Sequence, residues 1–198
     1  MNMAKNKTNK QNHYVNNEEF LNAMVSFRDD VILAKTNNTK RPQIPNYIGE
    51  CFIKIATHLS YKPNFINYTF RDDMISDGVE NCLQYIDNFD PEKSKNPFAY
   101  FTQIIYYAFL RRIQKEKKQL YVKYKAMERS GILEEMAVQD SVHGGATYNI
   151  RETPMYSNMR EFVESYELSV QAQKEKNQKN KLKKAKGLEK FANKENKQ

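Results

Sequence analysis

The side chains best suited to chemistry in this chain are charged and aromatic ones, concentrated between Arg71 and Arg129. From Arg71 to Glu92 there are seven acidic residues and one basic residue, a net charge of −6. From Arg111 to Arg129 there are eight basic residues and two acidic ones, a net charge of +6. An acidic helix suits a basic or amphipathic protein partner, whereas a basic helix suits phosphate. The pattern favours macromolecular binding, although two solvated faces of a helical bundle would carry the same charges.

The sequence contains no pattern typical of a catalytic centre. Its three histidines are scattered, and no phosphate-binding glycine loop, catalytic triad or cluster of nuclease carboxylates is present. Cys51 and Cys82 lack the spacing of metal ligands and sit among apolar residues, as buried thiols in a reducing cytoplasm do. We therefore expect no enzymatic activity, no cofactor and no metal site.

The acidic stretch is predicted to form a helix over residues 72–89. Asp72 and Asp73 suit the positive end of its dipole, and Pro91 disfavours helix in the residue before it. Apolar residues recur at helical spacing along one face: Met74, Ile75, Gly78, Val79, Cys82, Leu83 and Ile86. This face is expected to be buried, with the acidic residues opposite to it.

The basic stretch begins within a second predicted helix, which starts near Pro97 and runs to about Lys118. Its apolar side comprises Phe101, Ile105, Ala108, Phe109 and Ile113. A second face, aromatic at first and basic later, comprises Tyr100, Gln103, Tyr107, Arg111, Gln114 and Lys118. Past this helix, Tyr121 and Tyr124 interleave with lysines, so they could stack on a melted single strand or anchor the helix by packing. Packing is favoured for Tyr124, and both interpretations stay open for Tyr121.

The remaining periodicity predicts an all-α helical bundle with flexible basic N- and C-terminal tails. Helices are expected over about residues 17–35, capped by Asn16 or Asn17, and over about 47–59. The expected organisation is a disordered tail (1–13), a helical domain (14–136), a linker (137–153), an amphipathic helix (154–173) and a solvated, disordered lysine-rich tail (174–198). No apolar run is long enough for a membrane span, and the N-terminus lacks the apolar core of a secretory signal. We therefore expect a cytoplasmic protein without membrane contact.

These stretches resemble conserved region 2 of the primary-type bacterial sigma factors. The run DDMISDGVENCLQYIDNFD is similar to that family's polymerase-binding helix, and FAYFTQIIYYAFLRRI is similar to its promoter-melting and recognition helix. The run YVNNEEF, the helix around Cys51 and the short chain resemble, more narrowly, the late-transcription sigma factors of T-even-type bacteriophages. The resemblance covers roughly residues 14–136.

The resemblance implies a binding role for residues of both central helices. Those expected to meet the coiled coil of the largest polymerase subunit are Asp73, Ser76, Asp77, Glu80, Leu83 and Gln84. Those expected to contact DNA, from the resemblance together with the aromatic and basic face, are Phe98, Tyr100, Phe101, Ile104, Ile105, Tyr107, Ala108, Arg111, Arg112, Lys115 and Lys118. The spacing places Tyr100 and Tyr107 on the DNA-facing side, whereas the resemblance places Phe101 and Ile104 there.

One feature departs from the sigma-factor pattern, and a second feature near the end of the chain adds to the resemblance. Primary sigma factors carry paired tryptophans where this chain has Ile104 and Ile105, and the chain contains no tryptophan. Isoleucine cannot stack on a base as indole does, so strand opening would depend on nearby phenylalanines and tyrosines or on accessory proteins. Near the end, Leu188, Glu189 and Phe191 resemble the hydrophobic and acidic motif by which phage late sigma factors bind the sliding clamp, although Lys190 departs from it.

The resemblance therefore implies a phage-type late sigma factor acting in the cytoplasm of an infected bacterial host cell. It would bind the host RNA polymerase core, direct it to promoters with a −10-type element and aid strand opening, with a sliding clamp and a coactivator as further partners. Nothing after Gly131 is typical of a second helix-turn-helix for a −35 element. The alternative is a basic helical DNA-binding adaptor that does not bind polymerase.

Overall fold

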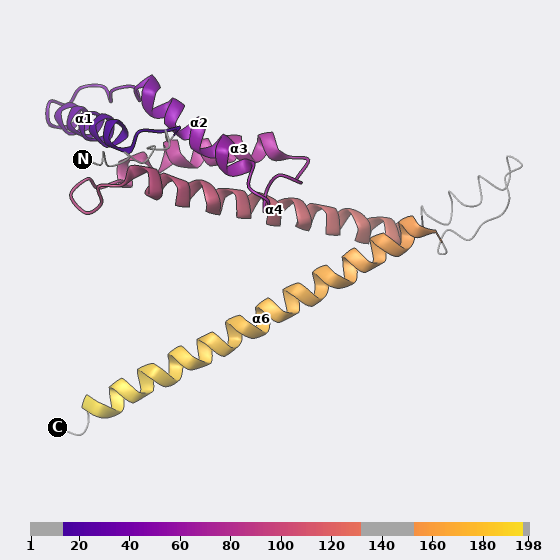
Figure 1. Cartoon of the computed structure of the whole chain (residues 1–198). Helices are drawn as coiled ribbons and strands as arrows, with labels where there is room; N and C mark the ends of the chain where they lie inside the picture. The colour runs from indigo at the N-terminus through magenta and orange to yellow at the C-terminus, as the bar shows by residue number, and fades with distance from the viewer. Residues whose placement is uncertain (1–13, 132–152, 196–198) are drawn as a thin grey trace, which may run out of the picture. The chain divides into compact units, whose positions relative to one another are not determined.

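The computed structural model describes residues 14–131 and 153–195, with side chains up to Lys183, and it contains no strand within these ranges (Figure 1). The elements follow in this order: α1 (Asn17–Thr36), α2 (Asn46–Ser60), α3 (Arg71–Gln84), the 3₁₀ turn η1 (Ile86–Asn88), α4 (Pro97–Ser130) and α6 (Pro154–Glu195). The predicted all-α fold is confirmed.

The chain divides into two compact units, residues 1–115 and 116–198. The boundary falls inside α4, which is one continuous helix, rather than near residue 136 as the sequence suggested. The last residue of α4 that is buried in the first unit's core is Ile113. Because no proline or glycine follows before Gly131, the helix continues beyond that core, and Gly131 then adopts a φ of 67° that suits the end of a helix.

Most helix ends lie within about two residues of their predicted positions, but α3 ends at Gln84 rather than at residue 89, and α4 runs to Ser130 rather than to about Lys118. Asn16 caps α1, because its side chain accepts a hydrogen bond from the Glu18 backbone N–H at 3.1 Å. A longer-range contact joins the same end of α1 to the start of α4: the Asn17 side chain accepts from the Phe98 N–H at 3.3 Å and donates to the Lys95 carbonyl. The Asn17 side-chain amide therefore connects the start of α1 to the backbone just before and just inside the start of α4.

Phe101 is the central aromatic residue of the first unit's core. Its ring centroid lies 4.6 Å from that of Phe52 and 5.8 Å from those of Phe20 and Phe89, and Phe20, Phe52 and Phe101 have no exposed surface. Helices α1, α2 and α4 and the turn after η1 thus meet around one side chain. Burial of this size is a main source of the unit's stability.

Helices α3 and α4 approach each other closely at Gly78. A Cβ atom at this position would lie 3.0 Å from Ile105 Cγ2 and 3.1 Å from Phe109 Cε1, closer than ordinary van der Waals contact. Glycine is needed here for proximity, because a larger residue would push the Ile105 and Phe109 side chains away. The close approach sets the spacing of the two helices whose outer faces carry the predicted binding residues.

In the second unit, residues 116–130 of α4 pack on the first part of α6. The rings of Tyr121 and Tyr166 stack with their centroids 4.5 Å apart, and Tyr124 meets Phe162 edge to face at 5.6 Å. Met159 and Val163 are buried, so the predicted amphipathic helix is present. Its backbone remains helical to Glu195, through most of the segment for which a disordered tail was expected. Lysine, glutamine, glutamate and alanine all favour helix, and the segment has no proline.

Candidate protein- and nucleic-acid-binding surfaces

Helix α3 presents the predicted polymerase-binding residues on its outer side. Asp77 is half-buried, and the other five residues are exposed: Asp73, Ser76, Glu80, Leu83 and Gln84. Leu83 stands out because it is the apolar residue among these six and is 39% exposed. The sequence assigned Leu83 to the buried face as well as to the binding set, and the structure places it outside.

Two of these acids already have a partner within the chain. Arg112 of α4 places Nη2 3.1 Å from Asp73 Oδ2 and Nη1 3.3 Å from Asp77 Oδ2, and its side chain is only 17% exposed. Arg112 is one of the residues predicted to contact DNA, and within this chain its guanidinium faces α3 and joins the two helices. The neighbouring Arg111 donates from Nη2 to Asn81 Oδ1 at 2.6 Å but remains exposed.

The part of α3 left available for a partner is smaller than predicted. Within the described residues, no hydrogen bond or ion pair engages the carboxylate of Glu80. Together with Ser76, Leu83 and Gln84 it forms an exposed polar and apolar patch, which we call the α3 surface. Tyr85, the residue that follows Gln84 at the end of α3, is 41% exposed and was not among the predicted binding residues.

Three of the predicted DNA-contacting residues lie in the core. Phe101 and Ile105 have no exposed surface and Ala108 has 2%, because their spacing puts all three on the inner side of α4. Their role is to hold α4 against α1, α2 and α3. Phe98, Tyr100 and Ile104 are half-buried, with Phe98 packed on Tyr14 and Tyr100 packed on Phe89.

The exposed side of α4 in the first unit is the one indicated by spacing. Tyr107 is 50% exposed, and Arg111, Gln114 and Lys115 are also exposed. We call these four residues the α4 surface. Tyr106, one of the nearby tyrosines on which strand opening was expected to depend, is 37% exposed and touches Tyr107 edge to face at 5.9 Å. An exposed aromatic ring followed by cations can combine base stacking with phosphate contacts.

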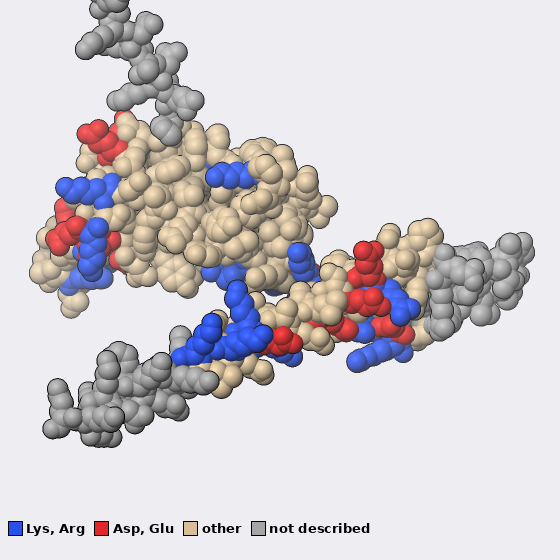
Figure 2. All heavy atoms as spheres, turned by 60° about the horizontal axis from the view of Figure 1, so that its bottom comes forward, with Lys and Arg blue, Asp and Glu red and all other residues tan. Residues whose placement is uncertain are grey.

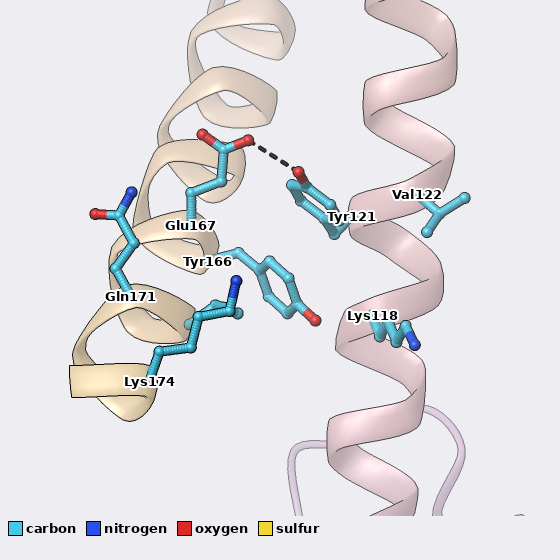
Figure 3. A pocket seen from close by; sticks show the side chains of 8 residues that line it. Lys118, Tyr121, Val122, Tyr166, Glu167, Gln171 and Lys174 are labelled. Carbon is cyan, nitrogen blue, oxygen red and sulfur yellow. Dashed lines mark hydrogen bonds between the residues drawn. The ribbon is translucent and has the colours of Figure 1, made fainter. Parts of the chain in front are cut away.

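In the second unit, Tyr121 is engaged with α6 (Figure 3). Its hydroxyl donates to Glu167 Oε1 at 2.9 Å, and Lys125 Nζ lies 3.2 Å from the same oxygen. The Tyr121 hydrogen bond and the Lys125 charge lower the pKa of the Glu167 carboxyl. The structure thus places Tyr121 as a packing residue. Tyr124 also packs, as predicted, but against α6 of the second unit and not against the helical bundle.

Beside this contact, α4 and α6 form the two walls of an open groove of about 330 Å³ (Figure 3). It is lined by Lys118, Tyr121, Val122, Tyr166, Glu167, Val170, Gln171 and Lys174. Lys118, a predicted DNA contact, therefore lies across the groove from Lys174. The walls are mostly apolar, and Glu167 is already satisfied by Tyr121 and Lys125.

Other predicted features have different outcomes. Cys51 and Cys82 are buried free thiols, as expected, and burial raises the pKa of Cys82 to about 12. Residues 14–131 and 153–183 contain no group of three side chains that could hold a metal ion, and none of the described helices is long and apolar enough to cross a membrane. Leu188, Glu189 and Phe191 fall within the bounds of α6, but their side chains lie outside the described part of the structure.

Comparison of the chain with protein-family models and with curated proteins found no match.

Proposed function

We propose that this protein is a sigma-type transcription factor that attaches to bacterial RNA polymerase core through the α3 surface and contacts promoter DNA through the α4 surface. One observation carries the proposal. Two helices held together by the close approach at Gly78 and by the Arg112 ion pairs expose chemically different outer faces: the α3 surface, with Glu80 and Leu83, and the aromatic and basic α4 surface. A factor that joins a protein to DNA requires two such faces.

The α3 surface suits a basic amphipathic helix, such as one strand of a coiled coil. Leu83 can enter an apolar seam, while Glu80 contributes charge complementarity and speeds the encounter. This partner would be the coiled coil of the largest polymerase subunit, as the sequence resemblance implies. We restrict the proposed polymerase contact to Glu80, Leu83 and Gln84, because Asp73 and Asp77 already bind Arg112.

The α4 surface supports recognition of a −10-type element with assisted strand opening. Arg111 and Lys115 would contact phosphates, and Tyr107, with Tyr106 beside it, would stack on an exposed base. Buried Phe101 and Ile105 do not take part directly. A −35 contact is not part of the proposal, so initiation would need a clamp or coactivator. The late-transcription role in a phage-infected cell rests on the sequence resemblance.

Clamp binding by Leu188, Glu189 and Phe191 is a separate part of the proposal. A peptide of residues 186–198 titrated into the cognate sliding clamp by calorimetry tests it. Heat of binding that disappears when Leu188 and Phe191 are replaced by alanine is the expected result. No heat at high micromolar peptide would remove the clamp from the list of partners.

The polymerase attachment is tested by a pull-down of purified bacterial core RNA polymerase. The variant E80K/L83K changes the centre of the α3 surface without touching the Arg112 ion pairs. A matched control is E50K/I53K on α2, where an exposed glutamate and an exposed isoleucine have the same spacing. We expect E80K/L83K to lose the polymerase and E50K/I53K to retain it.

The same experiment distinguishes the alternative, a basic DNA-binding adaptor. That alternative is favoured by the lysines of α6, which require no polymerase. If the unmodified chain fails to retain polymerase, or if E80K/L83K retains it as well as the control does, the sigma-type proposal is overturned. Both variants would then still bind DNA, as expected for a basic DNA-binding adaptor.

A further inference from the structure

The segment of α6 from Gln171 to Lys183 begins at the groove beside α4, to which it contributes Gln171 and Lys174, and continues beyond it. All thirteen of its side chains are exposed, and residues 174–183 include five lysines and one glutamate. Within the described residues, none of these five lysines forms an ion pair. Basic side chains gather on this segment, beside the grey C-terminal end of the helix (Figure 2). A solvent-exposed helix that carries this much charge of one sign indicates an anionic partner.

The five lysines occupy two opposite sides of the helix. Successive residues advance by about 100° around the axis. Lys174 and Lys181 therefore share one side, which continues the line of the groove residue Val170. Lys176, Lys179 and Lys183 share another side, roughly 180° away. We call these the first and second lysine stripes. Because neighbouring lysines within the second stripe repel one another, bound anions would stabilise this part of α6.

Between the stripes the helix has two different faces. One consists of the amides Gln173, Asn177 and Asn180, and the Gln173 Nε2 donates to Asn177 Oδ1 at 3.4 Å. The other contains Glu175 and Leu182. The amide face is therefore bordered by a lysine stripe on each side. Its amides can form hydrogen bonds with base edges, while the lysines on both flanks can contact phosphates.

This arrangement matches the major groove of duplex DNA. The groove is about 12 Å wide and admits an α-helix, whose diameter with side chains is about 10–12 Å. Phosphates form both walls, so a helix in the groove can use lysines on two opposite sides at once. A flat acidic protein surface could reach only one stripe, and a second copy of this positively charged segment would be repelled.

We propose that residues 173–183 of α6 bind in the major groove of duplex DNA without sequence preference. The two lysine stripes contact the phosphates of the two strands, and the amide face lies toward the base edges. Glu175 and Leu182 face away from the DNA. This contact is distinct from the α4 surface and does not depend on attachment to polymerase.

Fluorescence anisotropy with the full chain and a fluorescein-labelled duplex that contains no promoter-like sequence tests the phosphate contacts. The variant K176Q/K179Q/K183Q removes the second stripe, and K35Q/K40Q/K62Q removes three exposed lysines of the first unit as a charge-matched control. The slope of log affinity against log salt should fall by about 0.9 for each stripe lysine lost, and the affinity should fall by roughly tenfold or more. Circular dichroism checks that the helix is retained. If both variants weaken binding equally, the proposal is overturned.

The position in the groove is tested with competitors and with the amide face. Methyl green, which occupies the major groove, should displace the chain, whereas netropsin, which occupies the minor groove, should not. Q173A/N177A/N180A should weaken binding severalfold with no change in the salt slope, because amides release no counterions. Displacement by netropsin alone, or tighter binding to a single-stranded oligonucleotide than to the duplex, would contradict the proposal. These measurements contain no polymerase, so the test is separate from that of polymerase attachment.

Discussion

The guanidinium of Arg112 in α4 lies 3.1 Å from the carboxylate of Asp73 in α3, and it also pairs with Asp77. This relationship joins the two helices that carry the proposed binding surfaces. It also engages both partners within the chain: the arginine already pairs with two carboxylates, and the two aspartates are not fully available to a protein partner. The exposed neighbours Arg111 and Glu80 are left to make the external contacts.

Removal of this link should destabilise the first unit. R112Q leaves the Asp73 and Asp77 carboxylates without their charged partner, and the arginine is mostly buried. We expect the free energy of unfolding to fall by about 1–3 kcal/mol. Urea unfolding followed by circular dichroism measures the change. K115Q, which alters an exposed cation three residues later, should change stability by less than about 0.5 kcal/mol. Equal stability of the two variants would show that the ion pairs contribute nothing.

Alanine substitutions at Phe101 and Tyr107 should distinguish a residue that stabilises the fold from one that contributes to DNA binding. F101A opens a cavity between Phe20, Phe52 and Phe89 and should cost about 3–5 kcal/mol of stability. Y107A removes an exposed ring, so stability should hardly change, while binding to an opened promoter should weaken by about 1–3 kcal/mol if the ring stacks on a base. Denaturant unfolding and anisotropy measure the two effects. Normal stability of F101A would contradict the position of this ring in the core.

Asp90 gives the first unit a specific acid sensitivity. The Arg28 guanidinium, 2.6 Å away, and the Glu92 N–H lower the pKa of this carboxyl to about 2. Because the pKa is lower in the folded chain than the ordinary value of about 3.9, the carboxylate stabilises the fold above about pH 4. That contribution is lost as the pH falls toward 2. The melting temperature of the unmodified chain should therefore exceed that of D90N at pH 5, and the difference should shrink toward pH 2. A difference independent of pH would exclude this ion pair as its cause.

Gly49 in α2 and Gly78 in α3 should respond in opposite directions to alanine. Nothing lies within 4 Å of a Cβ atom at Gly49, so G49A should stabilise α2 by about 0.5–1 kcal/mol. At Gly78 the same methyl group meets Ile105 and Phe109, and the overpacking of about 1–3 kcal/mol should exceed the gain in helix propensity. Thermal unfolding of the two variants compares them directly. Stabilisation by G78A would mean that α3 and α4 can separate without loss.

The sequence by itself determined the helices of the first unit and where they begin. Asn16, the acidic residues at the start of α3 and Pro97 act within a few residues of the chain, so local patterns are enough to place these helix starts. The end of α4 was not placed, because the sequence predicted it near Lys118 and the helix runs to Ser130. The 3.6-residue repeat also separated the inner side of α4 from its aromatic and basic side. Where the resemblance placed Phe101 toward DNA, the repeat placed it inside, and the structure agrees with the repeat.

Only the tertiary structure decided which of two adjacent residues faces outward and which has a partner. Arg111 and Arg112 are equivalent in a sequence pattern, but Arg112 meets acids more than thirty positions earlier in the chain. The sequence left open whether Tyr121 stacks on DNA or packs within the protein. In the structure its partners are Tyr166 and Glu167 of α6, which lie more than forty positions later in the chain. Such partners depend on how helices pack after they form, and the free energy of those contacts is absent from any local stretch of sequence.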